Sequence, residues 1–374
     1  MLLSDSNMAF QWQPLLSALV VATLVSGYLA VFESTFGADK VAGIQKFHTQ
    51  STSRLGGLGI CLGMVCGIWL SSKYFPNDSL LGWWLLLISS PVFVGGLVED
   101  LTHRVTPRAR LLLACLSSAF VYFVFQVGVS RTDIPPIDEL LTVPGVALVI
   151  TMLVVAGFIN AVNIIDGFHG LASGAVIIML LGLSGLALFV NDGLVFRLCL
   201  VTASATLGFA IWNWPLGKIF LGDGGAYLLG LWVVELGLLL PHRSIDISPM
   251  APVLVGVYPL LETLYSMYRR RFVRSHPINH PDALHLHTLI YRRLILSPAV
   301  DKTNKDKNRA NAKVALMVWG FVLVPVICAL IFYQHTNTLL SLIAFFALVY
   351  GYLYKRIVHF KSPRILVAGH RKAK

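Results

Sequence analysis

Residues 143–160 read VPGVALVITMLVVAGFIN and residues 171–190 read LASGAVIIMLLGLSGLALFV, two long stretches without a charged side chain. A helix needs roughly 17 to 25 apolar residues to cross about 30 Å of hydrocarbon, so each stretch is long enough to span a membrane. Similar runs recur along almost the whole chain. The predicted spans are residues 14–32, 55–72, 80–98, 111–129, 143–160, 171–190, 198–214, 224–241, 249–268, 314–333 and 336–354.

The composition agrees with a chain that lies mostly in lipid. It is 56% hydrophobic and 13% charged, whereas soluble domains carry about 25% charged residues. The runs are too long for barrel strands, and helices are the other structure that satisfies the backbone in lipid. We therefore predict an all-α integral membrane protein with about eleven transmembrane helices, forming a single polytopic domain over residues 1–374. The first run is interpreted as a retained helix and not as a signal peptide, because no basic residue precedes it.

Lysine and arginine predict the orientation. If the N-terminus lies outside, 25 of the 29 Lys and Arg residues fall on the inner side of the membrane and 4 fall outside. This asymmetry predicts an outer N-terminus, an inner C-terminus and inner loops at 33–54, 99–110, 160–170, 213–224 and 269–313. The net charge of +11 is therefore mostly a signal of topology, and without a soluble basic domain no nucleic-acid partner is expected.

The five cysteines lie in apolar runs and show no metal-binding or redox spacing, so they are interpreted as packing residues.

Polar side chains of the kinds that bind ligands or catalyse reactions gather in four short segments, called strings below, all in predicted inner loops. The strings are Glu99-Asp100 followed by Arg104, Arg108 and Arg110; Asn160, Asn163 and Asp166-Gly167; Asn213-Trp214-Pro215 with Lys218 and Gly222-Asp223-Gly224-Gly225; and His280, Asp282, His285 and His287.

Asn160, Asn163 and Asp166 are three residues apart, so at a helix end they share one face and point toward one ligand. A solvated helix end with a turn at Asp166-Gly167 is the ordinary alternative. Gly222-Asp223-Gly224-Gly225 is typical of a turn where backbone approaches a phosphate while a carboxylate holds a hard cation, although Gly-Asp-Gly is also an ordinary turn.

Two further strings carry weaker signals. Glu99 and Asp100 end a predicted helix, where the helix dipole disfavours carboxylates, so a compensating cation is expected nearby. His285 and His287 could be a zinc pair, but no further ligands complete a tetrahedron, and polar loop histidines are the ordinary alternative. Carboxylates in three loops, with cations at the same face, suit Mg²⁺ and an anionic phosphate substrate.

Together the four strings resemble, in order, spacing and topology, those of the polyprenyl-phosphate N-acetylhexosamine-1-phosphate transferases of glycosyltransferase family 4. Asp39, Lys46, His48 and Arg54-Leu55-Gly56-Gly57 are similar to a further segment of that family, so the resemblance covers nearly the whole chain.

The resemblance implies transfer of a sugar 1-phosphate from a UDP-N-acetylhexosamine to undecaprenyl phosphate, with release of UMP. It implies Mg²⁺, with Mn²⁺ as an alternative, and a multi-pass protein of the bacterial inner membrane whose active site faces the cytoplasm. Membrane lipids and a second copy of the chain are further expected partners.

The same resemblance implies roles for individual residues. Asp223 would be the principal Mg²⁺ ligand, Asp100 would act on the lipid phosphate with Glu99 in support, and Asp166 would be catalytic or orient the substrate. The implied substrate-binding residues are Asn160, Asn163 and Asn213 for the nucleotide and Lys46, His285 and His287 for phosphates.

Three departures bear on the pathway. Glu99 replaces the first of the family's two aspartates, Ala226 replaces a serine, and Thr288 stands where many members have another histidine. The last departure favours synthesis of an outer polysaccharide such as O-antigen or lipopolysaccharide over peptidoglycan.

The alternative function is a membrane transporter, because Glu235 and Glu262 lie within apolar runs and intramembrane acids often mark a transport pathway. A CDP-alcohol type transferase is disfavoured because its paired Asp-Gly-x-x-Ala-Arg string is absent from the sequence. A lipid scaffold without activity remains a third alternative, should Glu99 and Ala226 be disabling.

Overall fold

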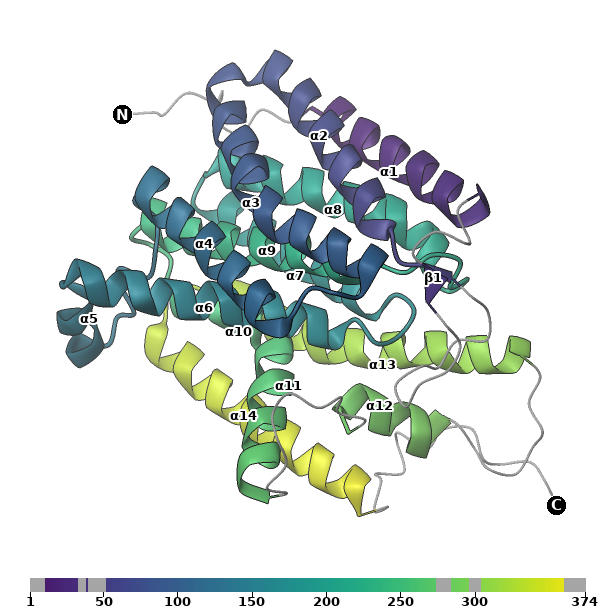
Figure 1. The fold of residues 1–374 in the computed structure, drawn as a ribbon. Helices are drawn as coiled ribbons and strands as arrows, with labels where there is room; N and C mark the ends of the chain where they lie inside the picture. The colour runs from purple at the N-terminus through teal and green to yellow at the C-terminus, as the bar shows by residue number, and fades with distance from the viewer. Residues whose placement is uncertain (1–10, 33–37, 40–51, 274–283, 296–303, 360–374) are drawn as a thin grey trace.

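The computed structural model of the protein describes residues 11–32, 38–39, 52–273, 284–295 and 304–359. Within these ranges the chain is almost entirely helical, and ten helices are long and apolar enough to cross a membrane (Figure 1). The predicted all-α membrane fold class is confirmed. The five cysteines are free.

The long helices are α1 (Gln13–Phe32), α2 (Gly56–Tyr74), α3 (Pro76–Thr102), α4 (Pro107–Phe125), α6 (Pro144–Ile165), α7 (Leu171–Phe189), α8 (Gly193–Asn213), α9 (Gly222–Arg243), α13 (Asn304–Ile331) and α14 (Thr336–Val358). The shorter elements are α5 (Pro135–Leu141), α10 (Met250–Val255), α11 (Val257–Tyr268), α12 (Leu286–Ile290) and the single π-helical turns η2 (Arg269–Val273) and η3 (Tyr291–Ile295). Strands β1 (Ala38–Asp39) and β2 (Thr52–Ser53) form a short antiparallel pair.

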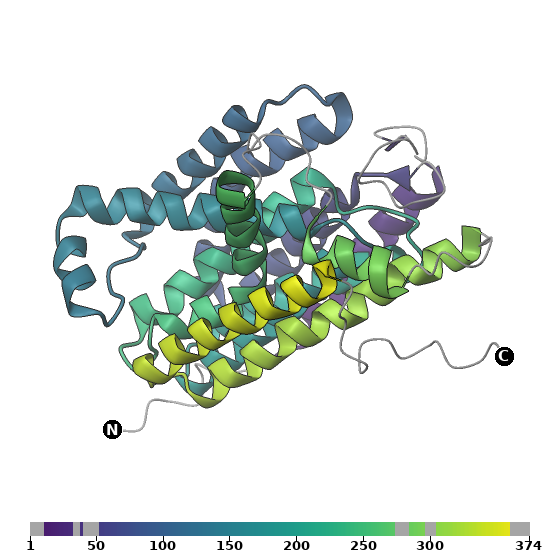
Figure 2. The same ribbon diagram turned by 90° about the horizontal axis from the view of Figure 1, so that it is seen from below.

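Helix α9 occupies the centre of the bundle. It packs against α2, α3, α6, α7 and α8, and nearly all of its side chains are buried (Figures 1 and 2). The outer helices α1, α4 and α14 instead expose large apolar side chains, including Leu24, Phe123 and Leu348. Apolar side chains on the outside suit a surface in contact with lipid, so the polar residues beside α9 lie at the core of a membrane bundle.

Local sequence signals explain where the helices near the centre begin and end. Helix α3 ends at Thr102, after which His103 adopts a left-handed conformation with φ of 53°. Helix α4 begins behind Thr106, whose hydroxyl accepts a hydrogen bond from the Ala109 N–H at 3.2 Å, and Pro107 takes the first helical position. The ends of α3 and α6 meet the start of α9 at one end of the bundle, because Asp100 and Asn163 both bind Asp223.

The predicted span 249–268 differs from expectation, because it is divided at Gly256 into α10 and α11. Pro259 has no N–H to bond the carbonyl of Val255, and its ring crowds that carbonyl, so a continuous helix is interrupted here. Figures 1 and 2 show α11 running across the direction of α6 and α13. The other ten predicted spans each fall on one long helix.

Candidate active site

Asp223 is the centre of a polar cluster at the start of α9. Its carboxylate accepts hydrogen bonds from Arg54 Nη2 at 3.1 Å, Arg110 Nη1 at 2.6 Å and Asn163 Nδ2 at 3.0 Å. These partners come from the segment before α2, the first turn of α4 and the last turn of α6. Four regions of the chain thus supply one site, with two guanidinium groups on a single carboxylate.

Backbone bonds hold Arg54 in this place. Ser53 O accepts from the Phe220 N–H at 2.9 Å, and the N–H groups of Gly56 and Gly57 each donate to the segment before α9 at 3.0 Å. The residues on either side of Arg54 are therefore tied to the residues that lead into Asp223. The guanidinium consequently reaches Asp223 and, through Nε at 3.3 Å, also Asp100. Arg54 is the compensating cation that the Glu99-Asp100 string predicted.

Asp100 is bound to the first turn of α9. Its two carboxylate oxygens accept from the backbone N–H groups of Asp223 at 2.9 Å and Gly224 at 3.0 Å, and the residue is 1% exposed. These N–H groups have no partner within the helix, so Asp100 caps α9 from a neighbouring helix. The turn requires glycine at Gly222, where φ is +75° and a Cβ would lie 2.5 Å from Asp100 Oδ2.

Asp166 follows the last residue of α6 and is partly exposed. Loss of hydration in the site raises the pKa of its carboxyl to about 7, against the lowering effect of Arg54, and the negative charges of Asp223 and Asp100 raise it further. The structure therefore brings the three predicted aspartates within electrostatic range of one another.

Two predicted site residues hold loops together in this structure. Glu99 Oε2 accepts from the Val105 N–H at 2.7 Å, which closes the turn between α3 and α4. The buried Asn213 accepts from the Gly170 N–H at 2.7 Å and donates to Ile219 O at 2.8 Å. Asn213 thereby connects the loop after α6 with the loop before α9.

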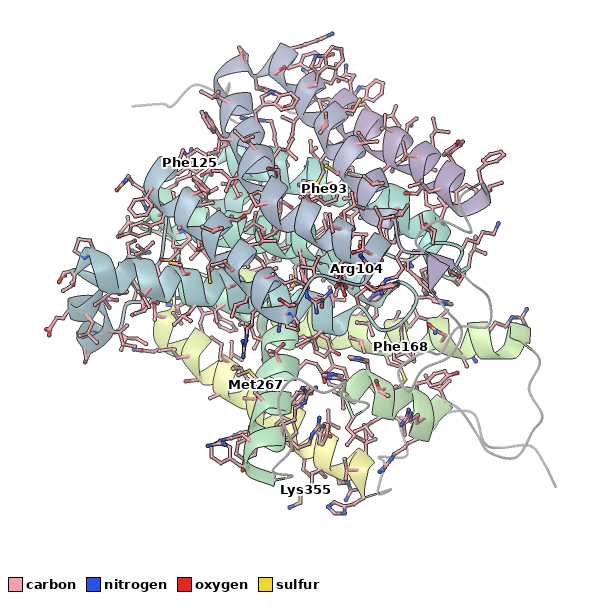
Figure 3. The ribbon with its side chains drawn as sticks, in the orientation of Figure 1. Phe93, Arg104, Phe125, Phe168, Met267 and Lys355 are labelled. Atoms are coloured by element: carbon pink, nitrogen blue, oxygen red, sulfur yellow. The ribbon has the colours of Figure 1, made fainter. Side chains whose placement is uncertain are left out.

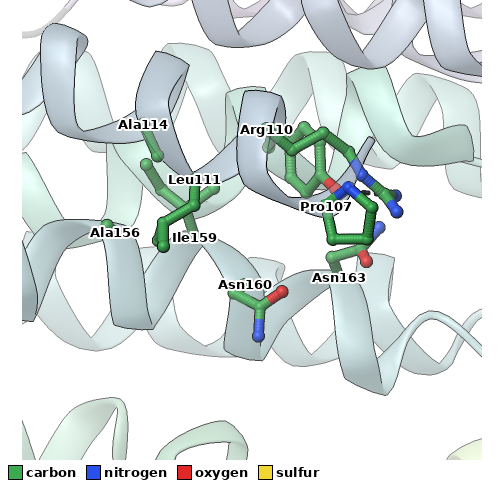
Figure 4. Close-up of a pocket in the computed structure, with 9 residues that line it drawn as sticks. Pro107, Arg110, Leu111, Ala114, Ala156, Ile159, Asn160 and Asn163 are labelled. Carbon is green, nitrogen blue, oxygen red and sulfur yellow. Dashed lines mark hydrogen bonds between the residues drawn. The ribbon is translucent and has the colours of Figure 1, made fainter. Parts of the chain in front are cut away.

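A cleft of about 120 Å³ opens beside Asn163 between α4, α6 and α9 (Figure 4). Its polar end is formed by Arg110, Asn160, Asn163 and Tyr227. Its apolar wall is formed by Pro107, Leu111, Ala114, Ala156 and Ile159. The Tyr227 hydroxyl also accepts from Arg110 at 3.2 Å, so the cation that binds Asp223 stands at the polar end of an apolar cleft.

The predicted histidines lie beside the loop that follows α6. The rings of His285 and His287 are stacked with centroids 5.2 Å apart. Phe168, which is labelled in Figure 3, packs against His287 at 5.6 Å and Tyr291 at 5.2 Å. Burial lowers the pKa of His287 to about 4, and His285 adds to this effect while the Glu262 carboxylate opposes it, so the ring is neutral at pH 7.

The remaining predicted site residue, Lys46, lies outside the described residues. Sequence reasoning assigned no role to Arg54, Arg110 or Tyr227, and it considered Glu262 as an acid of a transport pathway or of the same site. The structure places all four within or beside the site. The two arginines could be found from the sequence through the cation expected near the carboxylates at helix ends. Tyr227 and Glu262 lie in apolar runs, and only their polar atoms set them apart from the neighbouring residues.

Comparison with known proteins agrees with this architecture. The sequence profile of glycosyl transferase family 4 matches residues 82–240, a region that contains Asp100, Asp166 and Asp223. Within this region the chain is therefore similar to the members of glycosyl transferase family 4.

Individual relatives are moderately similar. A probable undecaprenyl-phosphate N-acetylglucosaminyl 1-phosphate transferase of Bacillus subtilis is 29% identical over 244 residues, 65% of this chain and 66% of the relative. An undecaprenyl-phosphate alpha-N-acetylglucosaminyl 1-phosphate transferase of Thermotoga maritima is 26% identical over 253 residues, 67% and 72% of the two chains. A phospho-N-acetylmuramoyl-pentapeptide-transferase of Rubrobacter xylanophilus is 27% identical over 252 residues, 61% and 74%.

Proposed function

We propose that the protein transfers an N-acetylhexosamine 1-phosphate group from a UDP-sugar to undecaprenyl phosphate and releases UMP. The observation that carries this proposal is the cleft beside Asp223, whose end is cationic and polar and whose wall is apolar. A polyprenyl phosphate has the same division, with a charged head and an apolar chain. The names of the Bacillus and Thermotoga relatives describe this acceptor and this sugar phosphate.

In the proposed reaction, an oxygen of the lipid phosphate attacks the phosphorus that is bonded to the sugar. The bond from that phosphorus to the bridging oxygen breaks, and UMP leaves with that oxygen. Two anions must meet for this step, so the guanidinium groups of Arg54 and Arg110 would offset their repulsion. Asp166, a carboxylate close to Asp223, can accept the remaining proton of the lipid phosphate, whose second pKa is about 6.

Asp100 fits this step less directly. Both of its oxygens are bound to backbone N–H groups of α9, so action on the lipid phosphate would require those bonds to be released. In this arrangement its contribution is to hold the first turn of α9, and with it Asp223, in place.

The donor set suits Mg²⁺, which takes one or two carboxylates and completes its shell with water and phosphate oxygens. Asp223 is the proposed principal ligand, and Asp166 is near enough for the charge of Asp223 to raise its pKa. Among the described residues no group of three His, Cys, Asp or Glu side chains could hold a metal alone, so substrate oxygens would be needed. When bound, Mg²⁺ would stabilise the negative charge of the departing UMP.

We further propose that the site faces the cytoplasm of a bacterial inner membrane and that the reaction starts an outer polysaccharide such as O-antigen. The positive-inside count supports the orientation, and Thr288 supports the pathway. The relatives include transferases with N-acetylglucosamine and with N-acetylmuramoyl-pentapeptide in their names, so the choice of sugar is left to experiment.

The test uses the purified full-length protein, undecaprenyl phosphate, Mg²⁺ and a panel of UDP-N-acetylhexosamines, with release of UMP as the readout. We expect release with at least one donor, and only when both the lipid and Mg²⁺ are present. Absence of UMP with every donor, from a protein that remains folded, would exclude the proposed reaction. The transporter alternative would then rest on Glu235, which is fully buried in α9 and has no hydrogen-bond partner among the described residues.

A further inference from the structure

Helix α11 buries polar side chains, while some of its apolar side chains are exposed. Glu262, Thr263 and Ser266 are buried, whereas Leu264 and Met267 are 60% and 46% exposed. A carboxylate with 0% exposure is costly unless other groups bind its oxygens. The partners of Glu262 therefore indicate why an acid is kept at this position.

Among the described residues, most of these partners belong to the histidine segment or to α11 itself, and Tyr350 of α14 lies close to the same carboxylate. Glu262 Oε1 accepts from the Leu286 N–H at 2.9 Å and lies 3.1 Å from His285 Nδ1. Its Oε2 lies 3.4 Å from the Tyr258 hydroxyl and 3.8 Å from His287 Nδ1. One carboxylate thus contacts the backbone between the two histidines and approaches the Nδ1 atom of both rings.

Other residues on the same face of α11 bind the same segment. Ser266, one turn after Glu262, places its hydroxyl 3.1 Å from His285 Nδ1. Arg269, in the following turn, donates to Leu284 O at 2.6 Å, and the hydroxyl of Tyr354 from α14 donates to the same carbonyl at 2.9 Å. Residues three or four apart on a helix lie on one face, so α11 and the first residue of η2 present a polar stripe that binds residues 284–287.

The opposite edge of the histidine pair lies against the loop that follows α6. A Cβ added to Gly167 would lie 3.2 Å from His287 Nε2, so this ring edge is in contact with the residue next to Asp166. The Nδ1 edge of His287 is turned toward Glu262, and its Nε2 edge is turned toward Gly167. A carboxylate at Nδ1 fixes which imidazole nitrogen carries the proton and how the ring is oriented.

We propose that Glu262 is a positioning residue that orients His285 and His287 toward the phosphates of the sugar donor. The proposal rests on the proposed function, because it takes the two histidines as contacts to the donor. Glu262 itself would touch no reacting atom. It acts through the histidines, by accepting from His285 Nδ1 and from the Leu286 N–H between them.

The test compares E262Q with E235Q in the full-length protein. Both substitutions keep size and remove a carboxylate that is 0% exposed, but Glu235 lies in α9 among apolar side chains, outside the site. We expect E262Q to lower kcat/KM for the UDP-sugar by about 10- to 100-fold, by analogy with the loss seen when the group that orients a metal-ligating histidine is removed. The KM for undecaprenyl phosphate should change by less than about twofold, and E235Q should resemble the wild type.

A double-mutant comparison distinguishes orientation from general support of the fold. In a chain that carries H285A and H287A, adding E262Q should cause no further loss, because the groups through which Glu262 acts are gone. An equal loss in both backgrounds, a loss shared by both substrates, or an E262Q protein with wild-type kinetics would each overturn the proposal. If E262Q does not fold, E262D keeps the buried charge, and its loss should again be confined to the UDP-sugar; a loss for both substrates would overturn the proposal.

The outcome also separates this inference from the proposed function. If the wild type releases no UMP with any donor, the reaction is excluded and kinetics cannot report on Glu262. Thermal unfolding of the same variants then measures the contact directly. Effects of E262Q and of H285A with H287A on Tm that are clearly less than additive would support the coupling of Glu262 to the histidines, and additive effects would exclude it.

Discussion

Substitution of Gly96 by alanine should disturb the site without changing any of its polar side chains. Gly96 lies on α3, one turn before Asp100, where α3 crosses the first turn of α9. A Cβ at this position would lie 2.5 Å from Gly224 N, 2.6 Å from Gly224 Cα and 2.7 Å from the carbonyl carbon of Asp223. All three neighbours are backbone atoms, so no side chain can rotate away to make room.

The magnitude follows from these distances. Ordinary contacts of a Cβ begin at 3.4 Å, so α3 and α9 would have to separate by about 1 Å, and overpacking of this kind costs about 1–3 kcal/mol. The two bonds from Asp100 to the first turn of α9 cross the same interface and would lengthen. A displacement of about 1 Å at reacting groups can cost about 100-fold in rate. We therefore expect G96A to lower Tm and to reduce UMP release by about 100-fold.

The matched control is G157A, the same change within α6. A Cβ at Gly157 would meet no atom within 4 Å, and alanine is about 1 kcal/mol better than glycine inside a helix. G157A should therefore keep full activity and an equal or higher Tm. If G96A showed wild-type turnover and an unchanged Tm, the close approach of α3 and α9 would not be what positions Asp100 and Asp223.

Three further predictions concern the metal, the pH dependence of stability and the topology. D223N keeps the shape of the side chain but removes its charge. UMP release should therefore fall by about 100-fold or more and require more Mg²⁺, while membrane insertion is unchanged. Normal Mg²⁺ dependence would show that Asp223 only closes a turn. His287 binds a proton near pH 6.5 when the chain is unfolded but only near pH 4 when it is folded. Between these values the unfolded chain holds more protons, so the free energy of unfolding should fall by up to about 3 kcal/mol as pH falls from 6.5 to 4. The fall in Tm should be smaller in H287Q, and an identical fall would exclude His287 as its cause. Reporters fused after Ser130 and after Lys374 should lie on opposite sides of the membrane, and identical sides would contradict the predicted orientation.

The sequence alone determined the helical membrane fold and the composition of much of the site. Both are local properties, because a run of apolar residues is either long enough to cross lipid or it is not. Local spacing also predicted that Asn160, Asn163 and Asp166 share one side of a helix end. In the structure, Asn163 binds Asp223 and Asn160 lines the adjacent cleft.

Only the tertiary structure decided how these groups are used. Asp100 caps a helix that begins 122 residues later, and Arg110 binds a carboxylate 113 residues away. The sequence shows Glu262 only as an acid within an apolar run, whereas the packing places it against His285, 23 residues further on. Such partnerships depend on how helices cross and on where glycines let their backbones approach, and neither hydropathy nor periodicity contains that information. The sequence therefore identified most of the carboxylates and histidines of the site, and the packing of the bundle assigned their partners.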